Sequence, residues 1–496
     1  MSFPVILNSP RTLTLLATTI SGLGIYFPFL WFLVPIGLGL FVYVLWFLTH
    51  TLKQAVFLGL LFGTGTGAVS IGWFWSALPL AWLAGNNEIS QILAVGIAWL
   101  VVSAAFGIGT AVVSPLIWYT RRNIFAPSLV PGMWTITELA RMWAFSLINY
   151  APQSLVGAHF SGAAFGYALT ESHLLLQFAQ FGGIHALNFL VGVFAVCFVI
   201  LIRISTRRAT QAEQYLGVLL CLCIIVPLMF FQTKRRDTGR PVPVQLISTY
   251  VPIETHDEET LKQLPSLLRS TASTSTTQTI IVLPESERLV ALFPAEKDIH
   301  KELKKFFPNN DTLIVTAGHV PTATGSSVTE LSYTSNIGGT LGTYNKMFLM
   351  PLGEYIPVLS IAEFSLLSNQ RLQAYITTPQ MGLLRGLDVT SVQWNGLTIG
   401  ALVCSDNQSP ILYRTIEKRS HASVLINVSN TSWFHDSHFL FSKNIQIAKV
   451  HAVQNNAYYL SADNMAPAFV IDPGGVVVAQ STWYEPSILN AYIYPE

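Results

Sequence analysis

Long uninterrupted hydrophobic runs fill the first half of the chain. A helix that crosses a membrane needs about 20 mostly apolar residues, because the hydrocarbon layer is about 30 Å thick. The pattern predicts seven such helices, near residues 12–30, 32–49, 55–77, 91–119, 126–145, 183–202 and 215–232. The first run is too long, and too poorly followed by small residues, to be a removable signal peptide.

Charged residues follow the same division of the chain. Only 12 of the 53 Asp, Glu, Lys and Arg residues lie in 1–233, and three of these precede residue 121. A soluble fold could not solvate so apolar a surface, whereas 234–496 has the charge content of an ordinary globular domain. We therefore expect a transmembrane helical domain over 1–233 and a separate globular domain over 234–496.

The loop charges predict how the helices are oriented. Loops that are rich in Lys and Arg tend to stay on the cytoplasmic side of the membrane. With a cytoplasmic N-terminus, the outward loops 78–90 and 146–182 carry no Lys or Arg, and the inward loops carry Lys53, Arg121, Arg122, Arg203, Arg207 and Arg208. Seven crossings then place the globular domain outside the cytoplasm, although Lys234–Arg236 lie on the less favoured side.

Two features of the membrane half each allow two interpretations. The outward stretch 146–182 is either a lipid entrance along the interface or a connecting loop with a short helix. Glu138 and Arg141 are three residues apart, so a helix places both on one face. Charges at membrane depth are usually paired or functional. This pair is either a structural ion pair or a binding site for a substrate head group.

The second half shows short hydrophobic runs, which are typical of buried strands. Strands are expected at Val242–Tyr250, Thr279–Leu283, Thr312–Ala317, Leu397–Val403, Ser423–Val428 and Ala468–Ile471. Helices are expected at Asp257–Arg269 and Phe439–Gln454, and a solvated loop at Ser270–Thr279. Strands that alternate with helices predict a layered α/β domain.

Cys404 is the one cysteine of the globular half and follows the apolar strand Leu397–Val403. It has no partner there for a disulfide, so it is either a reactive thiol or a buried structural residue. The other cysteines, Cys197, Cys221 and Cys223, fall in predicted membrane helices, where packing explains them. A nucleophile at the carboxyl end of a strand can face a crevice while its backbone stays rigid.

Two other segments supply groups that match a reactive cysteine. The apolar run Ile280–Pro284 ends in Glu285, and Tyr344-Asn345-Lys346 precedes the apolar run 347–352 and then Gly353-Glu354-Tyr355. In cysteine-based acyl transfer a carboxylate accepts the thiol proton, the thiolate attacks a carbonyl, and a cation stabilises the oxyanion. Each residue alone would more often be a solvated surface group.

In the order Glu285, Lys346, Cys404, the chain resembles the nitrilase superfamily. More narrowly, the run Tyr344–Lys346 followed by 351–357 is similar to the membrane-bound branch of that superfamily, the apolipoprotein N-acyltransferases. Further segments with this likeness are Gly59–Trp73, Pro131 to Arg141, Asn430–Phe434 and Ile471–Gly475. The resemblance covers nearly the whole chain and implies a multi-pass helical membrane domain plus a nitrilase-like α-β-β-α sandwich.

The resemblance also implies an activity. Members of the family transfer an acyl chain from phospholipid, through a cysteine thioester, to the N-terminal amine of diacylglyceryl-cysteine in lipoproteins, without a cofactor. Glu285 would be the general base, Lys346 the oxyanion stabiliser and Cys404 the nucleophile. Glu354 and Asp406 would support them. Trp433 and Phe434 would line the substrate site, which Glu138 and Arg141 could extend. The expected setting is a monomer in the bacterial inner membrane with its catalytic domain in the periplasm.

Several positions depart from the family pattern. Asp406 stands where a Glu is usual, and His435 follows the Trp-Phe pair in place of a Gly. The opening strand lacks the usual Gln-Gly/Asn pattern, Asp463–Pro467 replaces an Asn-Gly turn, and the sequence reaches Glu496 without the family's final membrane helix. These departures bear on the substrate more than on the chemistry.

Three functions therefore remain open. The first is N-acylation of lipoproteins with phospholipid as donor. The second is a membrane-tethered amidase or acyltransferase with another acceptor. The third is a non-catalytic relative, of the kind found with plasmid conjugation systems, that binds a partner.

A net charge of +1 gives no reason to expect nucleic acid. The segment 358–395 suits either a lid that touches lipid or a packed surface helix.

Overall fold

The computed structural model describes residues 9–80, 88–123, 125–230, 239–253, 256–274, 278–285, 303–305, 307, 311–323, 325–361 and 382–495. The chain forms two compact units. The first, which we call the helical unit, comprises residues 1–75, 92–148 and 156–233. The second, the sandwich unit, comprises 76–91, 149–155 and 234–496. A single boundary after residue 233 does not anticipate the two short segments, which pack with the sandwich.

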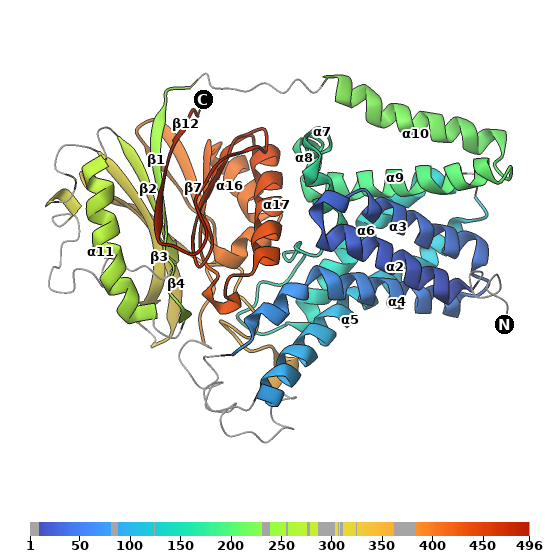
Figure 1. Cartoon of the computed structure of the whole chain (residues 1–496), viewed down its shortest axis with the longest axis horizontal. Coiled ribbons are helices and arrows are strands. Elements are labelled where there is room, and N and C mark those ends of the chain that lie inside the picture. The colour runs from blue at the N-terminus through green and yellow to red at the C-terminus, as the bar shows by residue number, and fades with distance from the viewer. Residues whose placement is uncertain are drawn as a thin grey trace. The chain divides into compact units, whose positions relative to one another are not determined.

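The helical unit consists of apolar helices joined by short helical turns (Figure 1). Its long helices are α2 (Pro10–Tyr26), α3 (Leu33–Tyr43) with its extension η2 (Val44–Leu48), α4 (Leu52–Ser70), α5 (Glu88–Thr120), α6 (Ala126–Ile148), α9 (Ile184–Ser205) and α10 (Gln211–Phe230). Each of the seven predicted spans overlaps one of these helices over most of its length. The shorter elements are η1 (Pro28–Leu30), η3 (Gly72–Ala77), η4 (Phe165–Glu171), α7 (His173–Leu176) and α8 (Ala179–Gly182).

Three of these helices, α4, α5 and α9, are by themselves long and apolar enough to cross a membrane, in the part of the chain that the structure describes. Large apolar side chains on the outside of the unit stay exposed, including Val112 at 65% and Leu201 at 62%. A helix that is apolar all round suits lipid. This unit is therefore a membrane domain, while the count of seven crossings stays a prediction.

Close helix packing in this unit uses small residues. A Cβ on Gly109 of α5 would lie 2.7 Å from the Cα of Arg141 on α6, so the two backbones approach as they do only at glycine. In the connecting stretch 146–182, Phe160, Phe165 and Tyr167 are 3%, 1% and 1% exposed. These aromatic side chains are packed inside the unit, as in a connecting segment with short helices.

The sandwich unit contains two six-stranded sheets. The first sheet has the order β12-β1-β2-β3-β4-β5, with β12 (Ser487–Ile493), β1 (Val242–Ser248), β2 (Thr279–Glu285), β3 (Thr312–Pro321), β4 (Ser327–Ser335) and β5 (Gly339–Asn345). The second has the order β11-β10-β9-β8-β7-β6, with β11 (Val477–Gln480), β10 (Phe469–Ile471), β9 (Tyr458–Asn464), β8 (Val424–Asn430), β7 (Leu397–Val403) and β6 (Ser391–Trp394).

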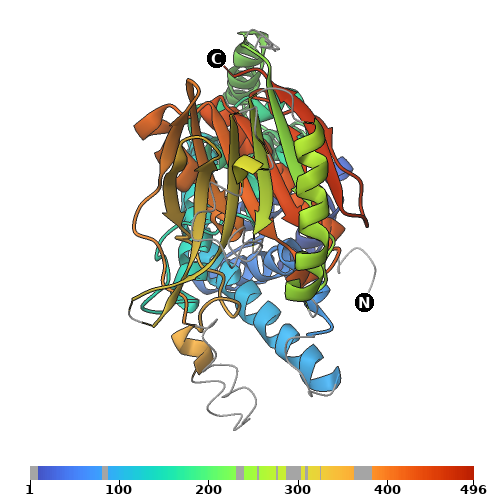
Figure 2. The same ribbon diagram turned by 90° about the vertical axis from the view of Figure 1, so that its left-hand side faces the viewer.

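Successive side chains along a strand point to opposite faces of the sheet, and both faces pack against other elements. On β2, Ile280 and Val282 enter the core between the sheets, whereas Ile281 and Leu283 pack against α11 (His256–Thr274). The second sheet is covered on its outer face by α16 (Leu412–Ser420) and α17 (His438–Asn455). Figure 1 shows the resulting order of helix, sheet, sheet and helix layers, and Figure 2 shows α11 lying across the first sheet. The predicted α-β-β-α sandwich is confirmed.

The hydrophobic runs predicted half of the strands, and the fully buried strand β9 is among those that they missed. All six expected strands are present, and Leu397–Val403 matches β7 residue for residue. The expected solvated loop at Ser270–Thr279 is wrong at its start, because α11 continues to Thr274. The strands that were not anticipated are β4, β5, β6, β9, β11 and β12. Several of them lie at sheet edges or alternate polar with apolar residues, so they lack a continuous apolar run.

Candidate active site

Glu285, Lys346 and Cys404 come from three parts of the chain, and each lies at or directly after the carboxyl end of a strand. Glu285 is the last residue of β2. β2 is parallel to β3, and β3 pairs antiparallel with β4, which pairs antiparallel with β5. β5 therefore runs in the same direction as β2. Lys346, directly after β5, thus lies at the same end of the first sheet as Glu285. On the second sheet, Cys404 directly follows β7, which is parallel to β8.

Lys346 lies between two carboxylates. Its Nζ is 3.3 Å from Glu285 Oε1 and 3.0 Å from Glu354 Oε1. The Lys346 side chain is 2% exposed, and those of Glu285 and Glu354 are 9% and 12% exposed. A buried ammonium is stable only where such acceptors surround it. The other oxygen of Glu354 accepts the Met350 N–H at 2.7 Å, which fixes the carboxylate in its turn.

The electrostatics of this group follow from its burial. Burial raises the pKa of Glu285; Lys346 lowers it, Glu354 raises it further, and a hydrogen bond from Cys404 lowers it. Burial alone would lower the pKa of Lys346, but Glu285 and Glu354 outweigh it and raise that pKa well above its usual range. Burial, followed by the charge of Glu285, raises the pKa of the Cys404 thiol well above its usual range. The resting group is thus a thiol beside a carboxyl and a permanent cation.

Asp406 holds the turn that carries Cys404. Its Oδ2 accepts the Val403 N–H at 3.1 Å and the Tyr344 hydroxyl at 2.8 Å. Its Oδ1 accepts the Phe348 N–H at 2.7 Å, on the segment after Lys346. One carboxylate therefore connects the ends of β5 and β7 across the sandwich. Burial raises the pKa of Asp406 to about 6, although Lys346 and the hydrogen bonds lower it.

The backbone at Cys404 is itself unusual. Its φ is +48°, in the left-handed region that non-glycine residues seldom occupy. Such a conformation at a strand end turns the side chain sharply out of the sheet and persists only where the surroundings hold it. The bond from the Val403 N–H to Asp406 supplies part of that support.

Asp463, the penultimate residue of β9, was noted in the sequence only as a departure from the family pattern. It is 4% exposed and accepts hydrogen bonds from Ser429 Oγ, Thr431 N and Thr431 Oγ1. Burial raises its pKa to about 7, with a smaller contribution from Glu285. A polar residue next to the end of a buried strand could have identified Asp463 in the sequence, as it identified Glu285.

The remaining predicted site residues are placed as follows. Trp433 and Phe434 are half-buried on η8 (Ser432–Phe434), at the exit of β8. Glu138 and Arg141 form a buried ion pair at 2.9 Å inside the helical unit. Substrate binding by these four residues stays a prediction. Of the segment 358–395, for which a lid and a packed surface helix were both open, residues 362–381 lie outside the described residues and 391–394 form strand β6.

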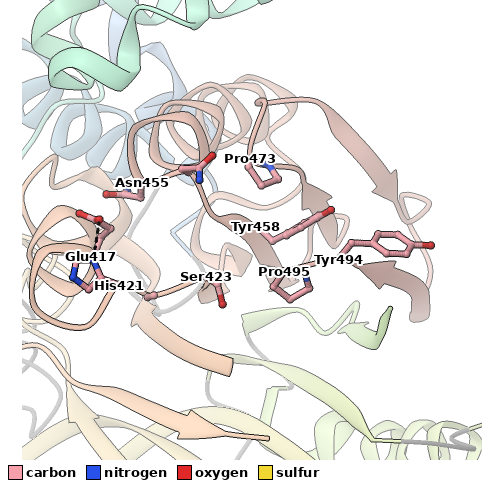
Figure 3. A pocket seen from close by; sticks show the side chains of 10 residues that line it. Glu417, His421, Ser423, Asn455, Tyr458, Pro473, Tyr494 and Pro495 are labelled. Carbon is pink, nitrogen blue, oxygen red and sulfur yellow. Dashed lines mark ion pairs between the residues drawn. The ribbon is translucent and has the colours of Figure 1, made fainter. Parts of the chain in front are cut away.

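A separate cavity of about 260 Å³ lies at the opposite ends of the strands in the second sheet (Figure 3). Its lining includes Ser423, just before β8, and Tyr458, the first residue of β9. It contains none of the predicted catalytic residues. Within the described part of the chain, no group of three or more His, Cys, Asp or Glu side chains could hold a metal ion.

Comparison with known proteins gives one consistent result. Residues 253–496 match the Carbon-nitrogen hydrolase family. An apolipoprotein N-acyltransferase of Pseudomonas syringae pv. tomato is 26% identical, over 89% of this chain and 83% of that protein. One of Shewanella oneidensis is 24% identical, over 94% and 86%. Among solved structures, a CN-hydrolase superfamily protein from Xanthomonas campestris is 16% identical with a TM-score of 0.37, over 51% and 91%.

A sandwich that matches carbon–nitrogen hydrolases, in one chain with apolar membrane helices, defines a membrane-bound nitrilase-like protein. Over most of its length the chain is similar to the apolipoprotein N-acyltransferases, the membrane-bound branch of proteins with such a domain, and residues 253–496 match the Carbon-nitrogen hydrolase family. Its relatives in that branch match it in both the membrane half and the sandwich half.

Proposed function

We propose that this protein is an acyltransferase that moves an acyl chain from phospholipid to the N-terminal amine of diacylglyceryl-cysteine in lipoproteins, through a thioester on Cys404. The observation that carries the proposal is the buried Lys346 ammonium, 3.3 Å from Glu285 and 3.0 Å from Glu354, with the Cys404 thiol hydrogen-bonded to Glu285. A cation, a base and a thiol together are what acyl transfer through cysteine requires.

In the first half-reaction Cys404 becomes acylated. Glu285 accepts the thiol proton as Sγ attacks the ester carbonyl carbon of the phospholipid, and Lys346 stabilises the resulting oxyanion. The oxyanion collapses, the C–O bond to the glycerol breaks, and Glu285 returns the proton to the departing alkoxide. The products are a thioester on Cys404 and a lysophospholipid.

In the second half-reaction the lipoprotein amine accepts the chain. The neutral amine attacks the thioester carbonyl and Glu285 accepts the proton it loses. The C–S bond breaks, the proton returns to sulfur, and an amide is released. The same base serves both half-reactions, because Glu285 passes on the proton it has accepted and returns each time to its carboxylate form.

The electrostatics support this division of roles. The raised pKa of the Cys404 thiol means that sulfur needs a base at hand to become nucleophilic. The raised pKa of Glu285 makes it a better proton acceptor than an ordinary glutamate. The raised pKa of Lys346 keeps the ammonium charged throughout the cycle.

The proposal extends to the surroundings of the enzyme. The donor and the diacylated acceptor are both anchored in lipid, which suits a catalytic domain fused to membrane helices. We place the protein in the bacterial inner membrane by analogy with the apolipoprotein N-acyltransferases, and the distribution of Lys and Arg in the loops favours a sandwich in the periplasm. We expect the protein to act as a monomer and without a cofactor.

The test is intact-mass analysis of the purified full chain after incubation with phospholipid. We expect the wild type to gain the mass of one acyl chain and Cys404→Ala to gain none. Cys197→Ala is the matched control, since Cys197 lies on helix α9 of the helical unit, and it should acylate like the wild type. An acylated protein that then modifies a diacylated lipopeptide supports the lipoprotein acceptor. The absence of any adduct on folded wild type, over several phospholipids, would contradict the proposal.

A further inference from the structure

The turn that carries Glu354 is short and held at several points. Glu354 N–H donates to the Met350 carbonyl at 2.9 Å, and Leu352 N–H donates to the Tyr355 carbonyl at 2.8 Å. Leu352 has a φ of +63°, which is costly for a branched side chain. A turn of this kind relaxes unless contacts outside it hold it in place. The position of the Glu354 carboxylate beside Lys346 therefore depends on what packs against residues 350–355.

Tyr355 anchors this turn to a segment two hundred residues earlier in the chain. Its side chain is 3% exposed, and its hydroxyl donates to the Asn149 carbonyl at 2.8 Å. Burial, with the nearby charge of Glu354, raises the pKa of Tyr355, so the hydroxyl remains a donor. Tyr355 directly follows Glu354, so the bond that holds its ring also restrains the backbone that carries the Glu354 carboxylate.

The segment 149–155, which we call the strap, makes further contacts on the same side. The Tyr150 carbonyl accepts the Val358 N–H at 2.9 Å, just beyond the turn. Ala151 joins a small buried cluster with Leu349, Tyr355 and Leu383. Ser154 closes the strap on itself, since its hydroxyl donates to the Ala151 carbonyl at 2.8 Å. The strap is therefore a compact part of the sandwich unit, although it follows α6 directly in the sequence.

We propose that the strap 149–155 is a positioning element of the active site, and that Tyr355 is the positioning residue through which it holds Glu354 beside Lys346. The inference rests on the proposed function for its kinetic consequence. Its structural part, the ordering of residues 350–355 by the Tyr355 hydroxyl, is independent of that function. The role differs from that of Glu354, which contacts Lys346 directly.

The test compares Tyr355→Phe with Tyr413→Phe in the purified full chain. Both substitutions remove one buried hydroxyl that donates to a backbone carbonyl: Tyr413 bonds to Ile426 at 2.7 Å, away from the Glu354 turn. We expect Tyr355→Phe to slow Cys404 acylation on the order of tenfold, with the phospholipid concentration for half-maximal rate unchanged, because misplaced catalytic groups lower the rate of chemistry. Tyr413→Phe should acylate at the wild-type rate.

Hydrogen–deuterium exchange of peptides covering 350–355 provides the second readout. We expect faster exchange there in Tyr355→Phe and no change in Tyr413→Phe. Wild-type exchange in this turn, or equal slowing of acylation by both variants, would overturn the strap proposal. If the wild type itself is never acylated, the proposed function fails, and the exchange measurement alone decides whether the strap orders the turn.

Discussion

Lys346 carries one positive charge for two neighbouring carboxylates, and this imbalance shapes the site. Two ionised carboxylates beside one ammonium repel each other, so the pKa of Glu285 is raised by Glu354 as well as by burial. In the proposed mechanism, the proton that Glu285 takes from the Cys404 thiol relieves that repulsion. The second glutamate is thus more than a structural support, since it makes Glu285 a stronger base.

Asp463 gives a residue-scale prediction about pH. Its pKa of about 7 in the folded protein lies above its ordinary 3.8. As the pH rises between these values, the unfolded chain releases this proton while the folded protein keeps it, so stability falls with rising pH and levels off above about pH 7. Asp463→Asn cannot ionise. We expect its thermal midpoint, relative to wild type, to rise on the order of 5 °C between about pH 5 and about pH 8.

The control for this prediction is Glu485→Gln, which changes an exposed carboxylate bonded to Thr482. Its midpoint relative to wild type should not change with pH. A pH-independent difference for Asp463→Asn would mean that Asp463 is ionised throughout this range in the folded protein.

At the scale of elements, the ends of parallel strands gather the chemistry. Strands β2, β8 and β9 end in polar residues, β7 is followed directly by Cys404, and the residues before these ends are buried. The buried run fixes the strand, and the first residues beyond it are held without being free to sample solvent. Glu285 and Asp463, within the last two positions of their strands, and Cys404, directly after its strand, are placed in this way.

The buried pair on α6 gives an element-scale prediction. Removing one partner of a buried ion pair leaves an uncompensated charge and costs about 3–5 kcal/mol, whereas replacing both by apolar groups is often nearly neutral. We therefore expect Arg141→Met or Glu138→Leu to lower the thermal midpoint sharply in detergent, and the double variant Glu138→Leu/Arg141→Met to recover most of the loss.

The pair between Arg203 and Glu213 is a matched control. It has the same 2.9 Å separation, but its side chains are 18% and 22% exposed. Arg203→Met should therefore cost about 1 kcal/mol or less. If Arg141→Met unfolds no more easily than Arg203→Met, the pair on α6 is not structural, and binding of a lipid head group becomes the better account.

At the scale of the whole molecule, the loop charges predict which side of the membrane each unit faces. We expect Asn395→Cys, in the exposed β6–β7 turn, to react with a membrane-impermeant maleimide in intact bacterial spheroplasts. Lys53→Cys, at the start of α4, should react only after lysis. Both are made in a chain whose four native cysteines are replaced by alanine.

Each variant serves as the other's control, because both positions are exposed and should be labelled equally after lysis. Labelling of Lys53→Cys in intact spheroplasts would reverse the predicted orientation. Labelling of both positions would place them on the same side, and the number of crossings between them would then be even.

Features that depend on burial along one segment could be predicted from the amino-acid sequence. Apolar runs reveal membrane helices and buried strands because a segment surrounded by lipid or core needs no polar face, and Leu397–Val403 was read to the residue for this reason. Cys404 and Glu285 were found because each interrupts such a run at its end. The edge strand β12, which alternates exposed and partly buried residues, gives no such signal.

Which of these segments lie in contact follows from the tertiary structure and not from local sequence patterns. The distance between Lys346 and its two carboxylates depends on the order of strands in the first sheet, and no local pattern encodes that order. The bond from Tyr355 to Asn149 joins residues 206 positions apart. Contacts of this kind arise when separate hydrophobic faces are buried against one another, which is a property of the folded chain as a whole.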